Sequence, residues 1–270
     1  GLALVLAVTA LTSVGFLADR VQQALALESH QLLGGDLLLS ADHPWPDEMR
    51  EEARRRHLRL AESQVFVSMV RSEAGAQLAE VKAVSDNYPL RGSLRTAPTL
   101  GAADAPTGAM PAPGQAWPDE RLVAGLAATP GASLKLGRLE LRSAAVLTLD
   151  PDRGVNAFAL APRLLINAAD LPASGLVQPG SRIAWRLHLA GESAAVKDFQ
   201  AWMEPRLGRG ERMESLDNAR PEVRNLIERS GRFLRLAALL TVILAAVAVG
   251  LAAGRYLRRH LDGCAVMRCL

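Results

Sequence analysis

The chain has 270 residues, of which 49% are hydrophobic, 22% are charged and only 4% are aromatic, and its formal net charge is +3. A chain of this length can bury a sizeable core. The excess charge is small, and no run of Lys and Arg is interleaved with aromatic side chains as in a nucleic-acid-binding surface. We therefore expect no nucleic acid among its partners.

The first predicted element is a membrane helix over 1–18, an apolar stretch without any charge. Its length approaches the ~20 residues that span the hydrocarbon of a bilayer, and it reads as a segment truncated at its start. A signal peptide is the alternative, but a basic n-region and a cleavage site followed by a turn are missing. The helical spacing continues over 19–33, where Val21, Leu25 and Leu32 share one face, and predicts a stalk helix.

The long middle stretch, 34–218, lacks Cys altogether and mixes strand and helix patterns. Domains in an oxidising compartment often avoid free thiols. We therefore predict an α+β domain outside the cytoplasm, arranged in two lobes. In its first part a strand is predicted at 36–41. A helix with acids in its first turn and arginines in its last is predicted at 46–59, and a β-hairpin is predicted from 64–72 and 76–86.

The run 97–114 is rich in Pro, Gly and Ala and almost uncharged, which predicts an exposed, mobile loop. The pattern then resumes until the end of the domain. It predicts a helix at 118–128, followed by two strand regions at 134–142 and 144–149. A helix at 161–171, a strand at 181–190 and an amphipathic helix at 192–207 complete the domain.

Two further helices are predicted at the end of the chain. The stretch 219–232 predicts a second stalk helix, in which Val223, Leu226 and Ile227 share a face. The following stretch, 233–254, contains a long uncharged run and predicts a second membrane helix.

Within this second membrane helix, Ala246, Gly250 and Gly254 recur every four residues. Small residues at this spacing allow a second helix to approach closely in lipid. We predict tight helix packing at these positions. The alternative is that the pattern reflects only a composition rich in Ala and Gly.

The last stretch, 255–270, forms a short amphipathic tail that holds both cysteines of the chain, Cys264 and Cys269. Residues five apart do not share a helical face, which disfavours a joint redox or metal role. We interpret both thiols as small apolar packing residues.

The sequence shows no common signature of catalysis or of metal binding. It contains no phosphate-binding G-x-x-x-x-G-K-[ST] loop, no G-x-S-x-G elbow and no H-E-x-x-H helix. Asp150 and Asp152 alternate as in a calcium loop, but such a loop would need Gly in place of Val155. A turn built by Pro151 and Gly154 is the favoured interpretation. We expect no catalytic residue, metal or cofactor in this chain.

Several short motifs resemble one known family, and they are spread over nearly the whole chain. The chain is similar to the MacB/FtsX-like ABC transporter permeases, and in particular to their YbbP-type subgroup. The motifs are YPLRG at 88–92, DPDRG at 150–154, APRLLINAADL at 161–171, QPGSR at 178–182, ARPEVR at 219–224 and RHLDGCAVMRCL at 259–270.

This resemblance implies that the α+β domain is a MacB-like periplasmic core and that 255–270 begins a cytoplasmic coupling helix. The family pattern at that helix is an acid, a Gly, apolar residues and an Arg. Asp262, Gly263 and Arg268 match the acid, the Gly and the Arg, while Val266 and Met267 belong to the apolar face. Asp stands where the family usually has Glu, which weakens the case for a specific salt bridge.

The implied function is that of a non-catalytic, multi-pass permease subunit in the bacterial inner membrane. It would transmit the ATP-driven motion of a separate ATP-binding subunit, a dimer, to the periplasmic domain. The other implied partners are a second permease copy or pseudo-symmetric half, lipids or other hydrophobic cargo, and a TesA-like periplasmic esterase as client.

Two other classes of protein share parts of this pattern. A transmembrane sensor has the same topology, but its second span is normally followed by a linker with a Pro and a heptad helix, and the tail here has no Pro. A membrane-anchored hydrolase is supported only by Ser and Asp residues that have no assigned role.

Overall fold

The computed structural model describes three stretches of the chain and a few isolated positions. The described residues are Phe16, Arg20, 34–153, 161–178, 180–215, Ile243, Ala246, Val247, 249–251, Gly254 and Arg255. The contacts divide the chain into two units, Gly1–Ala26 with Arg220–Leu270, and Leu27–Ala219, and the fold below is that of the second. Within the described part of the chain, none of the helices combines the length and the hydropathy that a membrane crossing requires.

The elements of the second unit alternate irregularly between strands and short helices, which makes it an α+β domain. In chain order they are β1 Leu37–Ala41, α2 Asp47–Arg55, β2 Arg59–Ser72, β3 Gly75–Val84, β4 Leu94–Ala97, β5 Ala105–Thr107, β6 Gln115–Pro118, α3 Glu120–Leu126, β7 Ser133–Leu136, β8 Leu139–Ser143, β9 Val146–Leu149, η1 Pro151–Arg153, β10 Arg163–Asn167, η3 Ala168–Asp170, α4 Leu171–Ser174, β11 Ala184–Ala190, α5 Ser193–Met203, η4 Glu204–Arg206 and β12 Arg212–Ser215.

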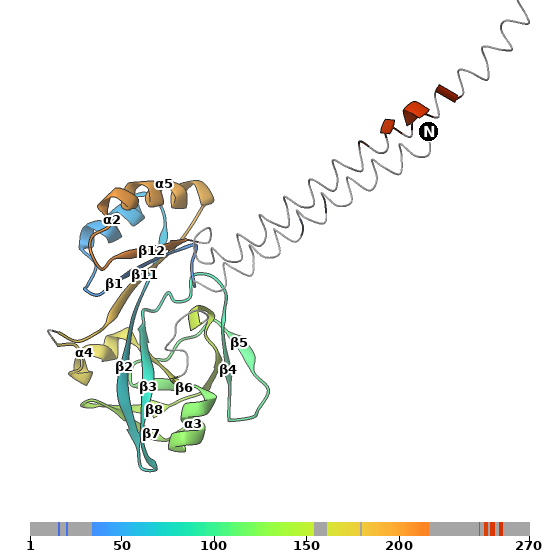
Figure 1. The fold of residues 1–270 in the computed structure, drawn as a ribbon. Coiled ribbons are helices and arrows are strands. Elements are labelled where there is room, and N and C mark those ends of the chain that lie inside the picture. Colours follow the sequence, from blue (N-terminus) through green and yellow to red (C-terminus); the bar gives the residue numbers. More distant parts are fainter. Residues whose placement is uncertain are drawn as a thin grey trace, which may run out of the picture. The chain divides into compact units, whose positions relative to one another are not determined.

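Most strands belong to one sheet, in the order β12-β1-β11-β2-β3-β10-β6-β8-β7 (Figure 1). An additional pairing of β2 with β7, at Val70↔Leu136, closes the strands from β2 to β7 into a barrel. A smaller sheet, β5-β4-β9, stands beside it. The long hairpin of β2 and β3 therefore belongs to the barrel, and β2 also pairs with β11 of the open part of the sheet.

The inside of the barrel holds the largest apolar cluster of the domain. In the register of the hairpin, Phe66 lies opposite Val81, and both belong to this cluster together with Leu164 and Ile166 of β10. Successive residues of a strand point to opposite faces. The neighbours Lys82 and Arg163 therefore lie on the outer face of the same strands.

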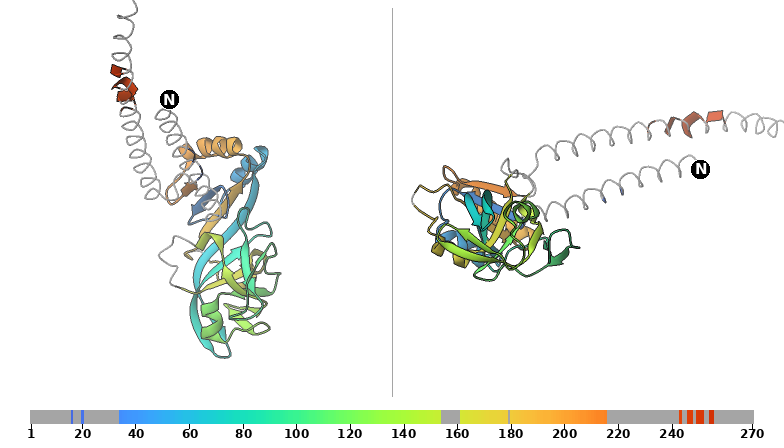
Figure 2. Two further views of the ribbon diagram at one scale, coloured as in Figure 1. Left: turned by 90° about the vertical axis from the view of Figure 1, so that its right-hand side faces the viewer. Right: turned by 90° about the horizontal axis from the view of Figure 1, so that it is seen from below.

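The open part of the sheet carries the helices α2 and α5 on one face (Figures 1 and 2). A second apolar cluster, which includes Leu37 and Leu39 of β1, Met49 of α2 and Phe199 and Met203 of α5, fills the space between them. These helices are too short to be stable alone in water, so it is this burial that stabilises them.

The chain enters and leaves the domain on neighbouring strands. Strand β1 is the first strand of the domain and β12 is its last, and they pair antiparallel with Leu37 opposite Ser215. The segments that precede residue 34 and follow residue 215 are therefore joined to adjacent positions at one edge of the sheet.

Two predictions about local structure need correction. The stretch 161–171, predicted as a helix, begins with strand β10, followed by the short turns η3 and α4. All five residues of β10 are buried, so its apolar run shows no alternation, and a run of that kind is ambiguous between helix and strand. The helix predicted at 46–59 ends at Arg55, because His57 has φ +58°.

The predicted loop 97–114 contains one element that the sequence did not indicate. Residues 105–107 form β5, which pairs with β4. Asp104, just before β5, accepts hydrogen bonds from Arg95 Nε at 2.6 Å and Arg95 Nη2 at 2.9 Å. These contacts connect the first part of the run to the smaller sheet.

Candidate functional site

The point where the chain enters the domain is built from Gly34, Gly35 and Asp36, which we call the domain root. Gly34 has φ +62°, and a Cβ there would lie 3.0 Å from the Tyr88 ring. A Cβ on Gly35 would lie 2.9 Å from the carbonyl oxygen of Leu189. The two glycines thus permit a left-handed turn and a close approach to β11 that larger residues would prevent.

The domain root is held by the 88–92 turn, which corresponds to the YPLRG motif. The amides of Leu90 and Arg91 donate to the carbonyl oxygen of Gly34 at 2.9 and 3.3 Å. The guanidinium of Arg91 donates to the carboxylate of Asp36, with an Nη2–Oδ2 distance of 2.9 Å. The turn therefore contacts the root through both its backbone and a charged side chain.

Behind this turn lies a group of ionised side chains that we call the buried charge network. Its members are three cations, Lys82, Arg163 and Arg186, three carboxylates, Glu80, Asp150 and Asp152, and the hydroxyl of Tyr88, and all are less than a tenth exposed. The cations come from β3, β10 and β11, while Asp150 and Asp152 come from the segment after β9.

The hydrogen bonds of the network converge on Asp150 and Asp152. Lys82 Nζ lies 3.0 Å from Asp150 Oδ2 and 2.5 Å from Asp152 Oδ1, and Arg163 Nη1 donates to both carboxylates. Arg186 Nη1 donates to Asp152 Oδ2 at 3.0 Å. Asp150 and Asp152 are thereby bonded to three strands of the main sheet.

Glu80 and Tyr88 join the network through separate hydrogen bonds. Glu80 accepts a hydrogen bond from Arg163 Nη2. The Tyr88 hydroxyl donates to Asp150 Oδ1 at 2.8 Å and accepts from Lys82 Nζ at 2.6 Å. Through Tyr88, the 88–92 turn is connected both to the network and to the domain root.

Burial and the mutual proximity of these charges shift their pKa values. Burial lowers the pKa of Lys82, and the carboxylates of Asp150 and Asp152 oppose that shift. Burial also acts to raise the pKa of Asp152, but the charges of Lys82 and Arg186 outweigh it and hold this pKa well below 3.8. Burial, followed by the two carboxylates, raises the pKa of Tyr88 well above 10. The Tyr88 hydroxyl therefore stays protonated and remains a donor.

This arrangement binds the segments of the domain together and offers no access for a substrate. Ser63 Oγ and His188 Nε2 are 2.9 Å apart, a pairing also found in serine hydrolases, but both side chains are 0% exposed. An ester could not reach this pair, so it does not provide a hydrolase site. Among the described residues, no group of three or more His, Cys, Asp or Glu could hold a metal ion.

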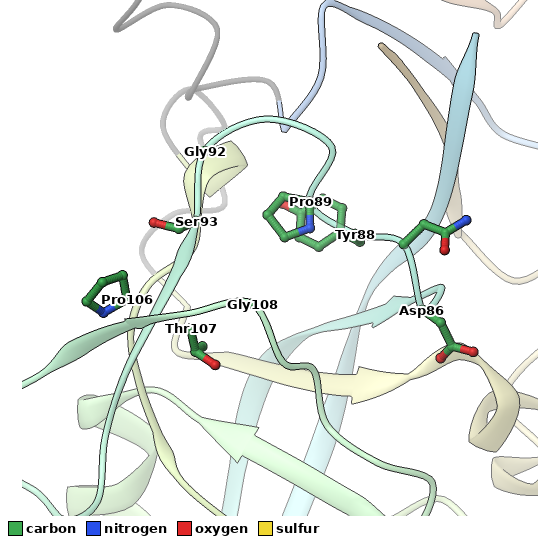
Figure 3. A pocket seen from close by; sticks show the side chains of 9 residues that line it. Asp86, Tyr88, Pro89, Gly92, Ser93, Pro106, Thr107 and Gly108 are labelled. Atoms are coloured by element: carbon green, nitrogen blue, oxygen red, sulfur yellow. The ribbon is translucent and has the colours of Figure 1, made fainter. Parts of the chain in front are cut away.

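A surface cavity of about 260 Å³ lies next to the 88–92 turn. It is lined by Asp86, Asn87, Tyr88, Pro89, Gly92 and Ser93, and by the segment from Pro106 to Gly108. Figure 3 shows the two segments on either side of the opening. The phenol of Tyr88 is already engaged by the network.

Most of the residues predicted to be functional lie outside the described part of the chain. These are the coupling residues Asp262, Gly263, Val266, Met267 and Arg268, and the stalk residues Val21, Leu25, Leu32, Val223, Leu226 and Ile227. Ala246, Gly250 and Gly254 are described, and all three are helical and exposed. A Cβ on either glycine would meet no described atom within 4 Å.

The root contacts and the buried charge network were not predicted from the sequence, although residues of three of the family motifs form them. One signal was available at Lys82, a lone cation in the strand pattern AEVKAV, and another at Arg163, directly before an apolar run. A charge within an otherwise apolar strand needs a partner if it is buried. The sequence does not say which residue that partner is.

Comparison with solved structures returns several matches, among them two periplasmic or extracellular domains of transporters. The periplasmic region of MacB from Actinobacillus actinomycetemcomitans matches with a TM-score of 0.45 and 11% identity, over 74% of this chain and 98% of that one. The extracellular domain of the noncanonic ABC-type transporter YknZ from Gram-positive bacteria matches with a TM-score of 0.42 and 9% identity, over 66% and 100%. Similarities of this size support no conclusion about the present chain.

Comparison of sequences is more informative. No family model matches the chain. An uncharacterized ABC transporter permease, YbbP of Escherichia coli (strain K12), is 35% identical to it over 269 residues, which is 100% of this chain and 32% of the relative. The chain thus spans about a third of the length of the relative that it matches. Over its entire length the chain is therefore similar to about a third of a YbbP-type ABC transporter permease, as its motifs predicted.

Proposed function

We propose that this chain is the part of a bacterial permease subunit that transmits the ATP-driven motion of a separate ATPase to a domain outside the cytoplasm. One observation supports this proposal above the others: the chain enters and leaves the domain on paired strands, with Leu37 opposite Ser215. Two stalks attached there would act on adjacent strands of one sheet.

The packing around these strands explains how a displacement would spread. β1 pairs with β11 on one side and with β12 on the other, and its inward side chains pack under α2 and α5. Protein interiors are close-packed and transmit strain instead of absorbing it. A shift of either stalk would therefore move the helical layer together with the open part of the sheet.

The remaining parts of the proposal concern segments for which the sequence alone provides support. Membrane helices over 1–18 and 233–254 and stalks over 19–33 and 219–232 would connect the domain to a coupling helix that begins at 255–270. Ala246, Gly250 and Gly254 would pack against another membrane helix, and Asp262 and Arg268 would contact the ATPase.

The wider setting of the proposal follows from the family resemblance. The domain would be a MacB-like periplasmic core with two lobes, in a multi-pass protein of the inner membrane. The permease would act with a dimeric ATPase and a second permease copy or pseudo-symmetric half. Its cargo would be lipids or other hydrophobic molecules, and a TesA-like periplasmic esterase would be its client.

Co-purification tests the contact with the ATPase. The whole permease is expressed with candidate ATP-binding subunits and purified in mild detergent, as wild type and as Asp262→Ala/Arg268→Ala. Arg255→Ala/Arg258→Ala removes two charges from the same tail and serves as the matched control. We expect the ATPase to be retained by the wild type and by the control, and lost from the first variant.

Two results would contradict the proposal. If no ATPase is retained by the wild type, the sensor alternative gains support, and ligand screening of the domain follows. If the ATPase is retained equally by all three proteins, Asp262 and Arg268 do not form the contact.

A further inference from the structure

We propose that Asp36 is the positioning residue that couples movement at the domain root to the rest of the domain, through a latch formed with Arg91 and Gly191. The inference rests on the proposed function, because it names the contact by which stalk motion would enter. It concerns described residues only.

The carboxylate of Asp36 joins three segments that are far apart in the sequence. It accepts from Arg91 Nε at 3.0 Å and from Arg91 Nη2 at 2.9 Å. It also accepts from the backbone amide of Gly191 at 3.0 Å. Arg91 Nη2 in turn donates to the Gly191 carbonyl oxygen at 3.3 Å. The root, the 88–92 turn and the connection from β11 to α5 thus meet at one carboxylate.

The burial of the acidic partner and the geometry of the pair make this contact specific. Asp36 is only 7% exposed, whereas the Arg91 side chain is 39% exposed. A bidentate pair of guanidinium and carboxylate fixes orientation as well as distance. An Asn at position 36 would keep the size of the side chain but could accept only through one oxygen.

Each arm of the latch leads to a different part of the domain. Gly191 lies two residues before α5, whose inner side packs on β1 and β11. Arg91 belongs to the turn whose Tyr88 hydroxyl bonds with Asp150 and Lys82 of the buried charge network. A movement of Asp36 therefore reaches both the helical layer and the network.

The strand pairing of β1 does not depend on the latch. β1 keeps its ladders with β11 and β12, and Asp36 lies just before that ladder begins. Without the carboxylate, the amides of Leu90 and Arg91 would still bond to the Gly34 carbonyl oxygen, but the charged contact with Arg91 and the bond from the Gly191 amide would be lost. The latch therefore affects the transmission of movement more than the stability of the fold.

The test is hydrogen exchange, measured by mass spectrometry, on the complex of whole permease and ATPase, with and without ATP and vanadate. In the wild type we expect nucleotide to change exchange in peptides covering the root, the 88–92 turn and the start of α5. In Asp36→Asn we expect the change to persist at the root and to disappear from the turn and from α5. The Gly191 amide should exchange about tenfold faster, because it loses a charge-assisted hydrogen bond.

Matched variants separate coupling from stability. Asp104→Asn breaks the bidentate pair of Arg95 and Asp104, whose side chains are 36% and 33% exposed, and this pair does not touch the root. It should leave the nucleotide response unchanged. Asp36→Glu keeps the negative charge that Asp36→Asn lacks, so part of the nucleotide response should remain. If Asp36→Asn fails to fold, Arg91→Gln tests the same contact from its more exposed side.

The outcomes are distinguishable. A wild type without any response to nucleotide would overturn the proposed function itself. A normal response in both Asp36→Asn and Arg91→Gln would overturn the latch and leave the proposed function standing. Loss of the response in Asp104→Asn as well would show that the effect is not specific to the latch, and would also overturn it.

Discussion

Replacement of Lys82 by Met is the most direct perturbation of the buried charge network. Met has a similar length and no charge, so the change leaves little empty volume. It removes the ammonium that lies 3.0 Å from Asp150, 2.5 Å from Asp152 and 2.6 Å from the Tyr88 hydroxyl. The network then holds two cations against three carboxylates.

The expected loss follows from the partners that remain. Removal of one member of a buried ion pair typically costs about 3–5 kcal/mol, because the other charge stays buried. Here Asp150 keeps its bonds from Arg163 and Tyr88, and Asp152 keeps those from Arg163 and Arg186. We therefore expect a loss near the lower figure, about 3 kcal/mol.

Urea unfolding of residues 34–215 measures this loss, because all four Trp residues of the chain lie in that range and report by fluorescence. With typical slopes of about 1–3 kcal/mol per M, the midpoint should fall by about 1 M or more. The exposed Lys135 provides the control, and Lys135→Met should change stability by no more than about 0.5 kcal/mol. The double variant Lys82→Met/Asp150→Asn should lose less than the sum of the single changes.

One result would refute this reasoning. If Lys82→Met were as stable as Lys135→Met, the lysine would not hold the carboxylates in place, and the assignment of the network would be wrong.

Three further predictions follow from single contacts. Gly35→Ala places a methyl group 2.9 Å from the Leu189 carbonyl oxygen and should cost about 1–3 kcal/mol in the same urea assay; an unchanged midpoint would contradict the close approach. Arg95 holds the pKa of Asp104 at about 2, so a carboxyl NMR titration should give a midpoint near that value and return toward 3.8 in Arg95→Gln. The pKa of Asp152 lies below its unfolded value of 3.8, so its contribution to stability is fully present above about pH 4 and is lost as the pH falls further; a urea midpoint that is the same at pH 3 and pH 6 would contradict this.

The sequence predicted best those strands that glycines delimit. Strand β1 follows Gly34 and Gly35 and appeared at the expected place, and so did the hairpin of β2 and β3, in which Gly75 stands at the turn. Strand β10 was misjudged because it is buried on both faces, and a fully buried strand loses the alternation that distinguishes it from a helix.

The contacts of the candidate site could not be predicted for a different reason. Asp36 and Arg91 are 55 residues apart, and Glu80 and Arg163 are 83 apart. They meet because β3 pairs parallel with β10 and because the 88–92 turn folds back on the root. Composition and periodicity carry no information about such pairings, which depend on the order of strands in the sheet.

The measurement that tests the central claim most directly is a distance between two spin labels in the domain of the assembled transporter. Positions Ala74, at the tip of the β2–β3 hairpin, and Asp198, on α5, are exposed and suit labelling once the native cysteines of the transporter, Cys264 and Cys269 among them, are replaced by Ala. We predict that trapping the ATPase with ATP and vanadate shifts this distance in the otherwise unaltered protein. An unchanged distance in a complex that hydrolyses ATP would contradict the claim that the motion of the ATPase reaches this domain.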